Sequence, residues 1–334
     1  MGYFVGCVCK RRREGGDPLA DRRKSVKSVP TFREAATIVH AEYSKTWRNK
    51  KHAAQWIRTL ETFAYPHVGN VPIDEIGTAE TLAVLSPIWL KRPETARRVR
   101  QRIGTVFDWA KAYGHRTDEN PIRSVSKGLP QQPRTERHHA ALPYAELPDF
   151  LVELRDCNSG SSAALALEFL ILTATRTNEV LRATWKEIDI NEGLWTISEE
   201  RMKAKREFRV PLSMRAIEVL HEASKSTDAN GYVFSGRRDR EPLSQMALLM
   251  LLKRMNKSFT THGFRSTFRD WAAERTNFSR EICESALAHV VKDKTAAAYL
   301  RTDQFAKRRK LMDAGATFAQ TTSKAKVLKL GGGG

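Results

Sequence analysis

The chain has 334 residues, and 41% of them are hydrophobic, which is enough apolar material for two globular domains. It carries 57 lysines and arginines against 38 aspartates and glutamates, a formal net charge of +19. A chain this basic most often binds a polyanion, and nucleic acid is the commonest one. A basic protein without a polyanionic partner is the alternative.

The cysteine content and the hydropathy pattern exclude two further classes of protein. Four cysteines are too few and too scattered for a disulfide framework, and Cys7-Val8-Cys9 lacks the spacing of a zinc site. The first apolar run, about seven residues long, is too short for a signal peptide, and no later run approaches the length of a membrane span. The sequence therefore predicts a reduced, cytoplasmic protein.

A basic tail and a helical unit are predicted first along the chain. Residues 1–28 are basic and interrupted by Gly-Gly-Asp-Pro, which is typical of a tail. The helical unit spans residues 29–123, and its first helix begins after Thr31, because Thr31-Phe32-Arg33-Glu34 matches a capping box. The second helix ends before Pro66, and a shorter third helix follows. The fourth begins with Pro93, since proline favours the first turn of a helix.

The fourth predicted helix carries a cluster of arginines beside its apolar positions. A solvated face is the ordinary explanation for such a cluster. In a chain with a net charge of +19, contact with the DNA backbone competes with that explanation. The candidate DNA-contacting residues are Arg97, Arg98, Arg100 and Arg102.

A linker and a second domain follow. Residues 124–140 are polar, contain proline and glycine, and lack periodicity, so they predict an interdomain linker. The second domain is predicted over residues 141–320, with a tail over 321–334. Its segment 163–172 is apolar apart from Glu168, which is typical of a helix buried on most sides.

The second domain also contains one predicted hairpin. Apolar residues alternate at 195–197 and at 208–212, and the stretch "RMKAKRE" between them predicts a basic tip. The remaining periodic segments are helical. The predicted fold class is therefore mainly α with a small β-sheet (α+β), with further helices at about 214–224, 243–255, 261–274, 279–289 and 294–301.

Common catalytic signatures are missing from the sequence. It contains no Walker-type phosphate loop, no Gly-x-Ser-x-Gly, no His-Glu-x-x-His and no carboxylate cluster suited to magnesium. An enzyme of this kind that acts on phosphate has to stabilise the phosphate charge with its own cations.

Four segments of the second domain supply suitable side chains. Taken singly, each has an ordinary structural explanation: an arginine paired with Glu179, an exposed lysine, two satisfied histidines and a half-buried tyrosine. Together they form the ordered set Arg, Lys, His-x-x-Arg, His, Tyr. Its members are Arg176, Lys203, His262, Arg265, His289 and Tyr299.

With this set, the chain resembles the tyrosine recombinases, specifically the integrases of phages and integrative elements. The strings "ERMKAKREFRVPLS", "HGFRSTFRDWAAERTNF" and "LAHVVKDKTAAAYLRTD" are close to those of satellite-phage-type prophage integrases. The helical unit is similar too, since "KHAAQWIRTLETFAYPHVGNVPIDEI" looks like their core-binding domain. The resemblance implies an all-α, SAM-like core-binding domain and a catalytic domain of the DNA breaking-rejoining type.

The resemblance also implies a role for each residue of the ordered set. Tyr299 is the expected nucleophile, which forms a 3′-phosphotyrosyl link to DNA. Arg176 and Arg265 are expected to bind the scissile phosphate, because a guanidinium donates to two oxygens and keeps its charge. Lys203 suits a general acid for the departing 5′ oxygen, and Glu179 supports the first arginine. In addition, His262 is expected to assist proton removal from the tyrosine, and His289 to hydrogen-bond the phosphate. Arg269 is expected to contact either the DNA backbone or an internal acid. The apolar residues Phe264, Phe268 and Trp271 are expected to anchor the helix.

The implied activity is metal- and ATP-independent DNA strand transfer that integrates or excises a phage or mobile element. No cofactor is expected. The expected partners are double-stranded DNA attachment sites, three further copies of the chain in a homotetramer on DNA, and accessory proteins of the integration host factor and excisionase types. The expected location is the bacterial cytoplasm, in association with the nucleoid.

Two departures from the family pattern accompany the resemblance. Ala174 stands where a glycine is common, and residues 1–28 are similar only to the trailing end of an arm-type DNA-binding domain. The basic segment 306–310 ("AKRRK") is interpreted as a tail able to reach a neighbouring subunit. An inactive prophage-remnant DNA-binding protein and a type IB topoisomerase are the alternative functions.

Overall fold

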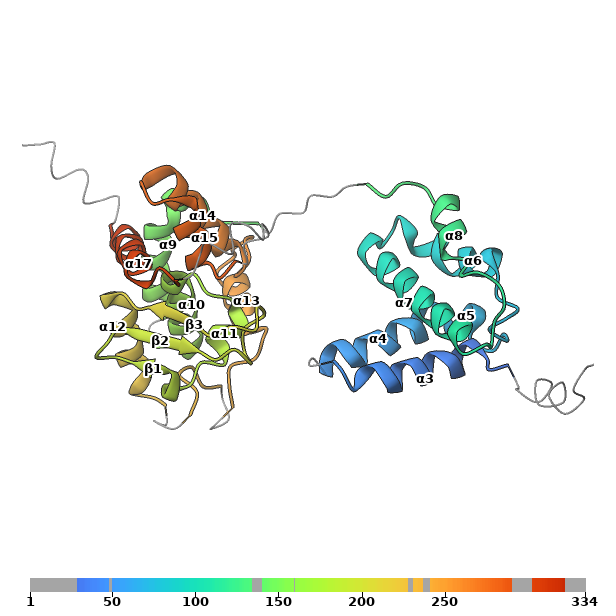
Figure 1. Cartoon of the computed structure of the whole chain (residues 1–334). Coiled ribbons are helices and arrows are strands. Elements are labelled where there is room, and N and C mark those ends of the chain that lie inside the picture. Colours follow the sequence, from blue (N-terminus) through green and yellow to red (C-terminus); the bar gives the residue numbers. More distant parts are fainter. Residues whose placement is uncertain are drawn as a thin grey trace, which may run out of the picture. The chain divides into compact units, whose positions relative to one another are not determined.

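The computed structural model describes residues 29–47, 50–133, 140–158, 160–227, 231–236, 241–289 and 302–321. The chain divides into two compact units, Met1–Glu136 and Arg137–Gly334 (Figure 1). Across the described residues, no helix combines the length and the apolar character needed to cross a membrane. The predicted tail 1–28, the predicted helix 294–301 and nearly all of the predicted tail 321–334 lie outside the described residues.

The first unit is all-helical. Its N-terminal capping box is confirmed, since the Glu34 carboxylate accepts a hydrogen bond from the Thr31 backbone N–H at 2.8 Å and Thr31 Oγ1 accepts one from the Glu34 N–H at 3.4 Å. The predicted start of the fourth helix at Pro93 is confirmed as well. The described helices are α3 (Phe32–Ser44), α4 (Lys50–Phe63), α5 (Tyr65–Val68), α6 (Thr78–Trp89), α7 (Pro93–Ala112) and α8 (Ile122–Gly128).

Helix α7 forms the centre of the first unit. Its predicted apolar stripe is buried, and it packs against α3, α4, α6 and α8. Phe107, which follows the stripe residue Val106, makes an edge contact with Phe32 of α3, with ring centroids 6.0 Å apart. The stripe residues Ala96, Val99, Ile103, Val106 and Ala110 are all at most 1% exposed.

Arg102 requires a correction to the predicted DNA contacts. The residue is only 5% exposed, and its Nη1 donates to the backbone carbonyls of Gln55 at 3.0 Å and Trp56 at 3.4 Å. Burial and, second, the charge of Arg98 lower the pKa of Arg102. Because the guanidinium joins α7 to the interior side of α4, Arg102 is removed from the candidate DNA contacts.

The predicted linker also differs from the structure. Residues 122–128 form α8, whose Val125 is fully buried in the first unit. Beyond α8, Pro130 accepts a hydrogen bond from the Trp89 indole N–H at 2.7 Å, and Gln132 donates to the Trp89 carbonyl at 2.7 Å. The stretch lacks periodicity because its helix is short and because side-chain hydrogen bonds, not a helix, hold Pro130 and Gln132.

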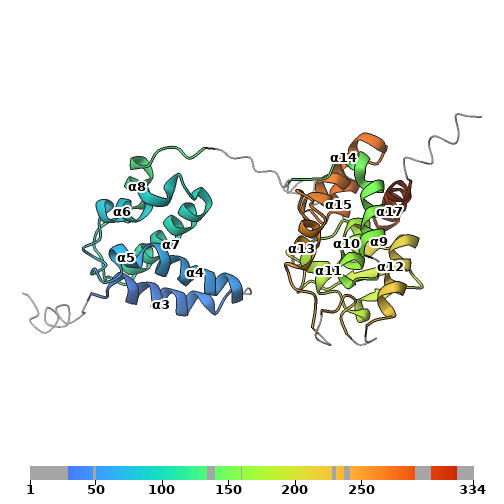
Figure 2. The same cartoon turned by 180° about the vertical axis from the view of Figure 1, so that it is seen from behind.

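The second unit is built around the apolar helix α10. This helix contacts α9, α11, α12, α13, α14 and α17, and in Figure 2 it lies centrally among its neighbours. The prediction of a helix buried on most sides is confirmed, because residues 164–173 are all buried. The described helices of this unit are α9 (Leu147–Asn158), α10 (Ser162–Thr173), α11 (Thr177–Leu181), α12 (Met214–Ser224), α13 (Ala247–Arg254), α14 (Gly263–Arg275), α15 (Arg280–Ala286) and α17 (Phe305–Gln320), with short 3-10 turns η1 (Tyr144–Glu146) and η2 (Trp185–Glu187).

One antiparallel sheet of three strands accompanies these helices, so the predicted fold class is confirmed. Its strands are β1 (Ile188–Asp189), β2 (Leu194–Ile197) and β3 (Phe208–Pro211), in that order. The predicted hairpin is β2–β3, with Trp195 paired to Val210 and Ile197 to Phe208. Trp195 and Ile197 are fully buried, since alternate residues of a strand face the same side.

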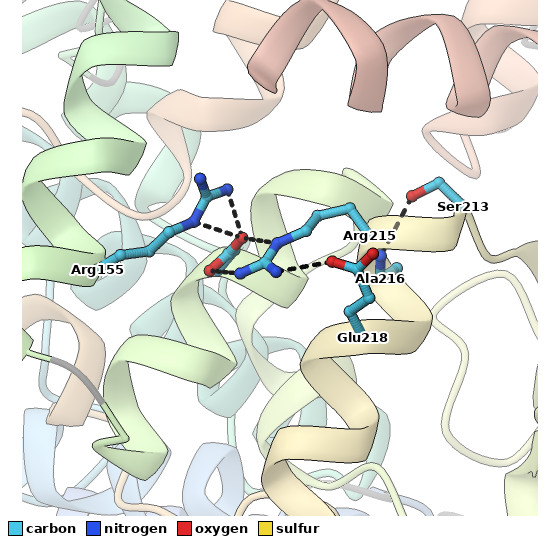
Figure 3. A network of polar contacts seen from close by, with 6 residues as sticks. Arg155, Ser213, Arg215, Ala216 and Glu218 are labelled. Carbon is cyan, nitrogen blue, oxygen red and sulfur yellow. Dashed lines mark hydrogen bonds and ion pairs between the residues drawn. The ribbon is translucent and has the colours of Figure 1, made fainter. Parts of the chain in front are cut away.

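The one charged residue of the buried segment in α10 is neutralised by two arginines (Figure 3). Glu168 is 2% exposed and accepts hydrogen bonds from Arg155 at 2.6 and 3.0 Å and from Arg215 at 2.7 and 3.3 Å. Burial alone would raise the pKa of Glu168, but the hydrogen bonds and charges of the two arginines outweigh it and lower the pKa. Arg215 also pairs with Glu218 at 2.8 Å.

The basic segment 306–310 is not a tail. It lies in α17, which packs against α9, α10, α12, α15 and β3 of its own unit. Arg308 is fully buried and donates to the Arg209 carbonyl at 2.6 Å and to the Asp303 carboxylate at 3.0 Å. Because Leu311 and Met312 are buried on the same side, this helix is part of the core of the second unit.

Candidate phosphate-binding site

The site begins where α10 ends. Ala174 caps α10 in the left-handed conformation, with φ of 50°, which explains why a glycine is common at this position in the family that the sequence resembles. Arg176 is then the N-cap of α11. The predicted brace is present: the Glu179 carboxylate accepts from the Arg176 backbone N–H at 2.8 Å and from its Nη1 at 3.0 Å.

The stretch His-Gly-Phe-Arg at residues 262–265 positions Arg265, the second arginine of the site. A side chain on Gly263 would lie 2.2 Å from the Ala140 carbonyl oxygen, so only glycine lets the start of α14 approach that backbone. Phe264, Phe268 and Trp271 are at most 8% exposed and anchor the helix, as predicted.

Arg265 points from α14 to the ends of α10 and α15. Its Nη1 donates to the Ala174 carbonyl at 2.5 Å, and its Nη2 donates to the Leu287 carbonyl at 2.6 Å. The same Nη2 lies 3.0 Å from His289 Nε2. These contacts fix the position of the guanidinium, and the residue is only 5% exposed.

The segment after α15 joins the two arginines. Ala288 has a left-handed backbone, with φ of 49°, and its carbonyl accepts from Arg176 Nη2 at 3.2 Å. His289 follows, next to Arg265. Because Leu287 and Ala288 accept from different arginines, Arg265 and Arg176 are held on one short segment of chain.

An acidic residue that sequence reasoning missed orients His289. Glu284 Oε2 lies 2.6 Å from His289 Nδ1, and Glu284 Oε1 forms an ion pair with Arg269 Nε at 2.7 Å. Of the two roles predicted for Arg269, the internal ion pair is therefore present. Burial would raise the pKa of Glu284, but the hydrogen bond from His289 and the charge of Arg269 lower it. No sequence pattern marks this acid, since it lies five residues before the histidine.

The electrostatics of the site favour an anion. Burial, and next the positive charge of Arg176, lower the pKa of Arg265 to about 10, so Arg265 is still charged at neutral pH. Glu179 and Glu284 offset part of this repulsion. Two fixed guanidinium groups that repel each other are stabilised by a bound tetrahedral oxyanion, to which each can donate in a fork.

The other predicted residues are placed as follows. Lys203 is exposed in the loop between β2 and β3, and His262 is exposed as the N-cap of α14. Thr177 Oγ1, beside Arg176, lies 3.2 Å from Thr261 Oγ1, which links α11 to the start of α14. Tyr299 lies outside the described residues. In the part of the chain that is described, no three His, Cys, Asp or Glu residues cluster as metal ligands.

Both units match known protein families. Residues 32–126 match the phage integrase central domain, and residues 142–304 match the phage integrase family. The prophage integrase IntZ of Escherichia coli is 34% identical over 298 residues, which cover 86% of this chain and 73% of that protein. The integrase of enterobacteria phage P4 is 28% identical over 320 residues, which cover 90% of this chain and 72% of that protein.

Solved structures share the fold. A lambda integrase dimer bound to a COC′ core site matches with a TM-score of 0.65 at 19% identity, over 86% of this chain and 82% of that one. A lambda integrase tetramer bound to a Holliday junction gives a TM-score of 0.65 at 18% identity, over 87% of this chain and 88% of that one. With the family matches and the identity to IntZ, these findings make the chain a member of the phage integrase family, a tyrosine recombinase of the prophage integrase type.

Proposed function

We propose that the chain breaks and rejoins DNA strands through a covalent 3′-phosphotyrosyl intermediate, with Arg176 and Arg265 binding the scissile phosphate. The Tyr299 oxygen attacks the phosphorus, the bond to the 5′ oxygen breaks, and the 5′ oxygen leaves with a proton as a hydroxyl. Attack by a 5′ hydroxyl of the other DNA site reverses these steps and releases the tyrosine. The convergence of Arg176 and Arg265 on segment 287–289 is the observation that carries this proposal.

Three further residues are assigned to proton transfer and phosphate binding. Lys203 is the proposed general acid for the departing 5′ oxygen. His262 assists removal of the proton from the tyrosine phenol, whose unperturbed pKa is about 10. His289 is proposed to donate a hydrogen bond to the phosphate through Nε2, and Glu284, Oε2 of which lies 2.6 Å from His289 Nδ1, orients the ring.

The proposed reaction needs neither a metal ion nor ATP. Two guanidinium groups supply the positive charge that the pentavalent phosphorus requires, and their positions are fixed by backbone carbonyls before DNA binds. The phosphotyrosine ester conserves the energy of the broken phosphodiester, so rejoining needs no further energy source.

The proposed partners are double-stranded attachment-site DNA and further copies of the chain. Two of the structural neighbours are described as a dimer on a core site and a tetramer on a Holliday junction, which supports assembly of a homotetramer on DNA. Integration host factor and an excisionase are proposed accessory partners. In the first unit, Arg97, Arg98 and Arg100 of α7 are proposed to contact the DNA backbone; the first two are exposed and Arg100 is half-buried.

Substitutions on α7 separate a DNA contact from a structural arginine. Arg98→Ala is expected to weaken DNA binding and to reduce the slope of affinity against salt by about one ion, because Arg98 is exposed. Arg102→Ala is expected to lower the stability of the first unit by about 2 kcal/mol, because it removes two hydrogen bonds that a buried guanidinium donates from α7 to backbone carbonyls of α4. Salt-dependent binding and thermal unfolding measure the two effects. Equal loss of affinity in both folded variants contradicts the assignment.

Glu284→Gln is expected to slow covalent attachment to DNA by roughly 10- to 100-fold, by analogy with the loss found when the partner that orients a metal-binding histidine is removed. The amide keeps the size of the side chain but loses the charge that pairs with His289 and Arg269. Glu281→Gln, an exposed position on the same helix α15, is the matched control. Equal rates for the two variants would remove Glu284 from the site.

A nicked suicide substrate tests the function. The DNA is a duplex that carries the direct repeat flanking the gene, with a nick next to the cleaved bond, so that the released fragment diffuses away and the adduct accumulates. We expect a covalent protein–DNA adduct that forms in EDTA and without ATP. Absence of the adduct, or its loss on chelation, contradicts the proposal, and relaxation of any supercoiled plasmid without sequence preference would indicate a topoisomerase instead.

A further inference from the structure

The loop that carries Lys203 needs a fixed position. The pairing of β2 with β3 ends at Ile197 and Phe208, so residues 198–207 extend beyond the sheet. Lys203 is exposed at this tip, as are Lys205 and Arg206. A general acid has to lie within hydrogen-bond reach of the leaving oxygen, and a free ten-residue tip, counted from those strand ends, holds no such position by itself.

Arg201 ties this loop to the rest of the unit. Its Nη1 bonds to both carboxylate oxygens of Glu187, and its Nη2 donates to the Glu179 backbone carbonyl at 2.5 Å. Among the loop residues that the structure describes, Arg201 is the one whose side chain has polar contacts outside the loop. Met202, the next residue, is 4% exposed and packs in the core.

Both acceptors of Arg201 are themselves fixed. Glu187 Oε2 also accepts from the Trp195 indole N–H at 3.1 Å, and Trp195 is fully buried. The backbone carbonyl of Glu179 lies near the end of α11. In a continuing helix the N–H of Ala183 would donate to this carbonyl, but here it donates to the Val180 carbonyl. The side chain of Glu179 is the brace of Arg176, so the loop is anchored to the turn that carries the first phosphate-binding arginine.

We propose that Arg201 is a positioning residue that fixes Lys203 for proton transfer to the leaving 5′ oxygen, by clamping the β2–β3 loop between Glu187 and the end of α11. This inference rests on the proposed function, in which Lys203 is the general acid. In this account the Arg201 guanidinium acts by joining the loop to the Glu187 carboxylate and the Glu179 carbonyl, and it is given no role in binding DNA.

A change of leaving group tests the proposal. The suicide substrate is made in two forms, one with the normal 5′ oxygen and one with sulfur at the same bridging position, because a thiolate leaves without a proton donor. With oxygen, Lys203→Ala is expected to cleave about 100-fold or more slowly than the unaltered chain, and sulfur is expected to restore most of the rate. Arg201→Ala is expected to show the same pattern, with a loss of at least about 10-fold on oxygen.

Three controls make the result decisive. Arg206→Ala removes an equal charge from an exposed position of the same loop and is expected to leave both rates unchanged. Arg201→Lys keeps the charge without the fork and is expected to fall between Arg201→Ala and the unaltered chain, and thermal unfolding shows that each variant is folded at the assay temperature. On a Lys203→Ala background, Arg201→Ala is expected to add little further loss, since the two residues act through one step.

The outcomes separate the inference from the function on which it rests. If sulfur fails to restore Lys203→Ala, the general-acid role of Lys203 is wrong. If sulfur restores Lys203→Ala but folded Arg201→Ala is equally slow on both substrates, Arg201 acts elsewhere, for example through Arg176, and the positioning role is overturned. Multiplicative losses in the double variant would overturn it too.

Discussion

Replacing Arg265 by alanine is expected to lower the rate of covalent adduct formation by about 1,000-fold, near the upper end for loss of one preorganised donor. The side chain is proposed to donate directly to the phosphate. It also holds the Ala174 and Leu287 carbonyls, at 2.5 and 2.6 Å, and lies beside His289. Its loss therefore removes a charge and loosens the segment that Arg176 contacts. Single-turnover cleavage of the suicide substrate measures the effect.

Arg265→Lys distinguishes charge from geometry in this prediction. Lysine keeps the positive charge but cannot donate to two carbonyls and a phosphate at fixed angles, so we expect a loss of at least about 100-fold. Arg275→Ala, an exposed position at the end of the same helix α14, is the control. Folded Arg265→Ala protein that cleaves at the normal rate contradicts the proposed site.

Replacing Glu168 by alanine is expected to lower the free energy of unfolding of the second unit by about 3 kcal/mol, at the low end for breaking a buried ion pair. The Glu168 side chain is 3% exposed, whereas the side chains of Arg155 and Arg215 are 31% and 20% exposed and regain some hydration. Denaturant unfolding measures the loss. Glu218→Gln, which removes the other partner of Arg215 at a 54% exposed side chain, is expected to change stability by less than about 1 kcal/mol.

The stabilisation by Glu168 depends on pH in a defined direction. The folded state lowers the pKa of this carboxyl below its ordinary value of 4.5, so its contribution is complete above that value and declines as the pH falls through the lower, folded-state pKa. We expect the stability difference between the unaltered chain and Glu168→Gln to be constant above about pH 5.5 and to shrink below about pH 4. A difference that grows on acidification contradicts the pairing.

The parts of the fold that local patterns encode were predictable. The capping box at Thr31, the start of α7 at Pro93 and the pairing of Trp195 with Val210 all follow from residues close in sequence or from strand alternation. The strand β1 was missed because it has only two residues, which pair with the neighbouring strand β2. The helix α8 was missed because it is short and packs against α6 and α7.

Buried arginines were the main source of error. Arg102 lies three residues after Val99 and four before Val106, and Arg308 lies three residues before Leu311, so each is on the apolar stripe of its helix. A charge count cannot tell such residues from exposed cations, but their helical position can. Both are satisfied by the protein itself, Arg102 by backbone carbonyls and Arg308 by a carbonyl and Asp303.

Arg265 also lies on the apolar stripe of its helix, since Phe268 lies three residues on and Ala272 seven, and both are buried. It differs from Arg308 in its surroundings. Arg308 has the carboxylate of Asp303 at 3.0 Å, whereas the charge of Arg176 disfavours the charged form of Arg265. Arg308 therefore has a counter-ion at hydrogen-bond distance within the fold, whereas Arg265 donates to backbone carbonyls and lies next to a second cation. The sequence motif located Arg265, but only the structure identifies Glu284 as the partner of His289 and Arg201 as the anchor of the β2–β3 loop.

The central claim is that a tyrosine oxygen displaces a DNA 5′ oxygen at a phosphate held by two arginines. The most direct measurement is digestion of the trapped adduct with nuclease and protease, followed by mass spectrometry of the nucleotide-bearing peptide. The account predicts a single peptide in which Tyr299 carries a 3′-phosphorylated nucleotide, and no such peptide from Tyr299→Phe. A nucleotide joined through its 5′ phosphate, or an adduct that persists in Tyr299→Phe, would contradict it.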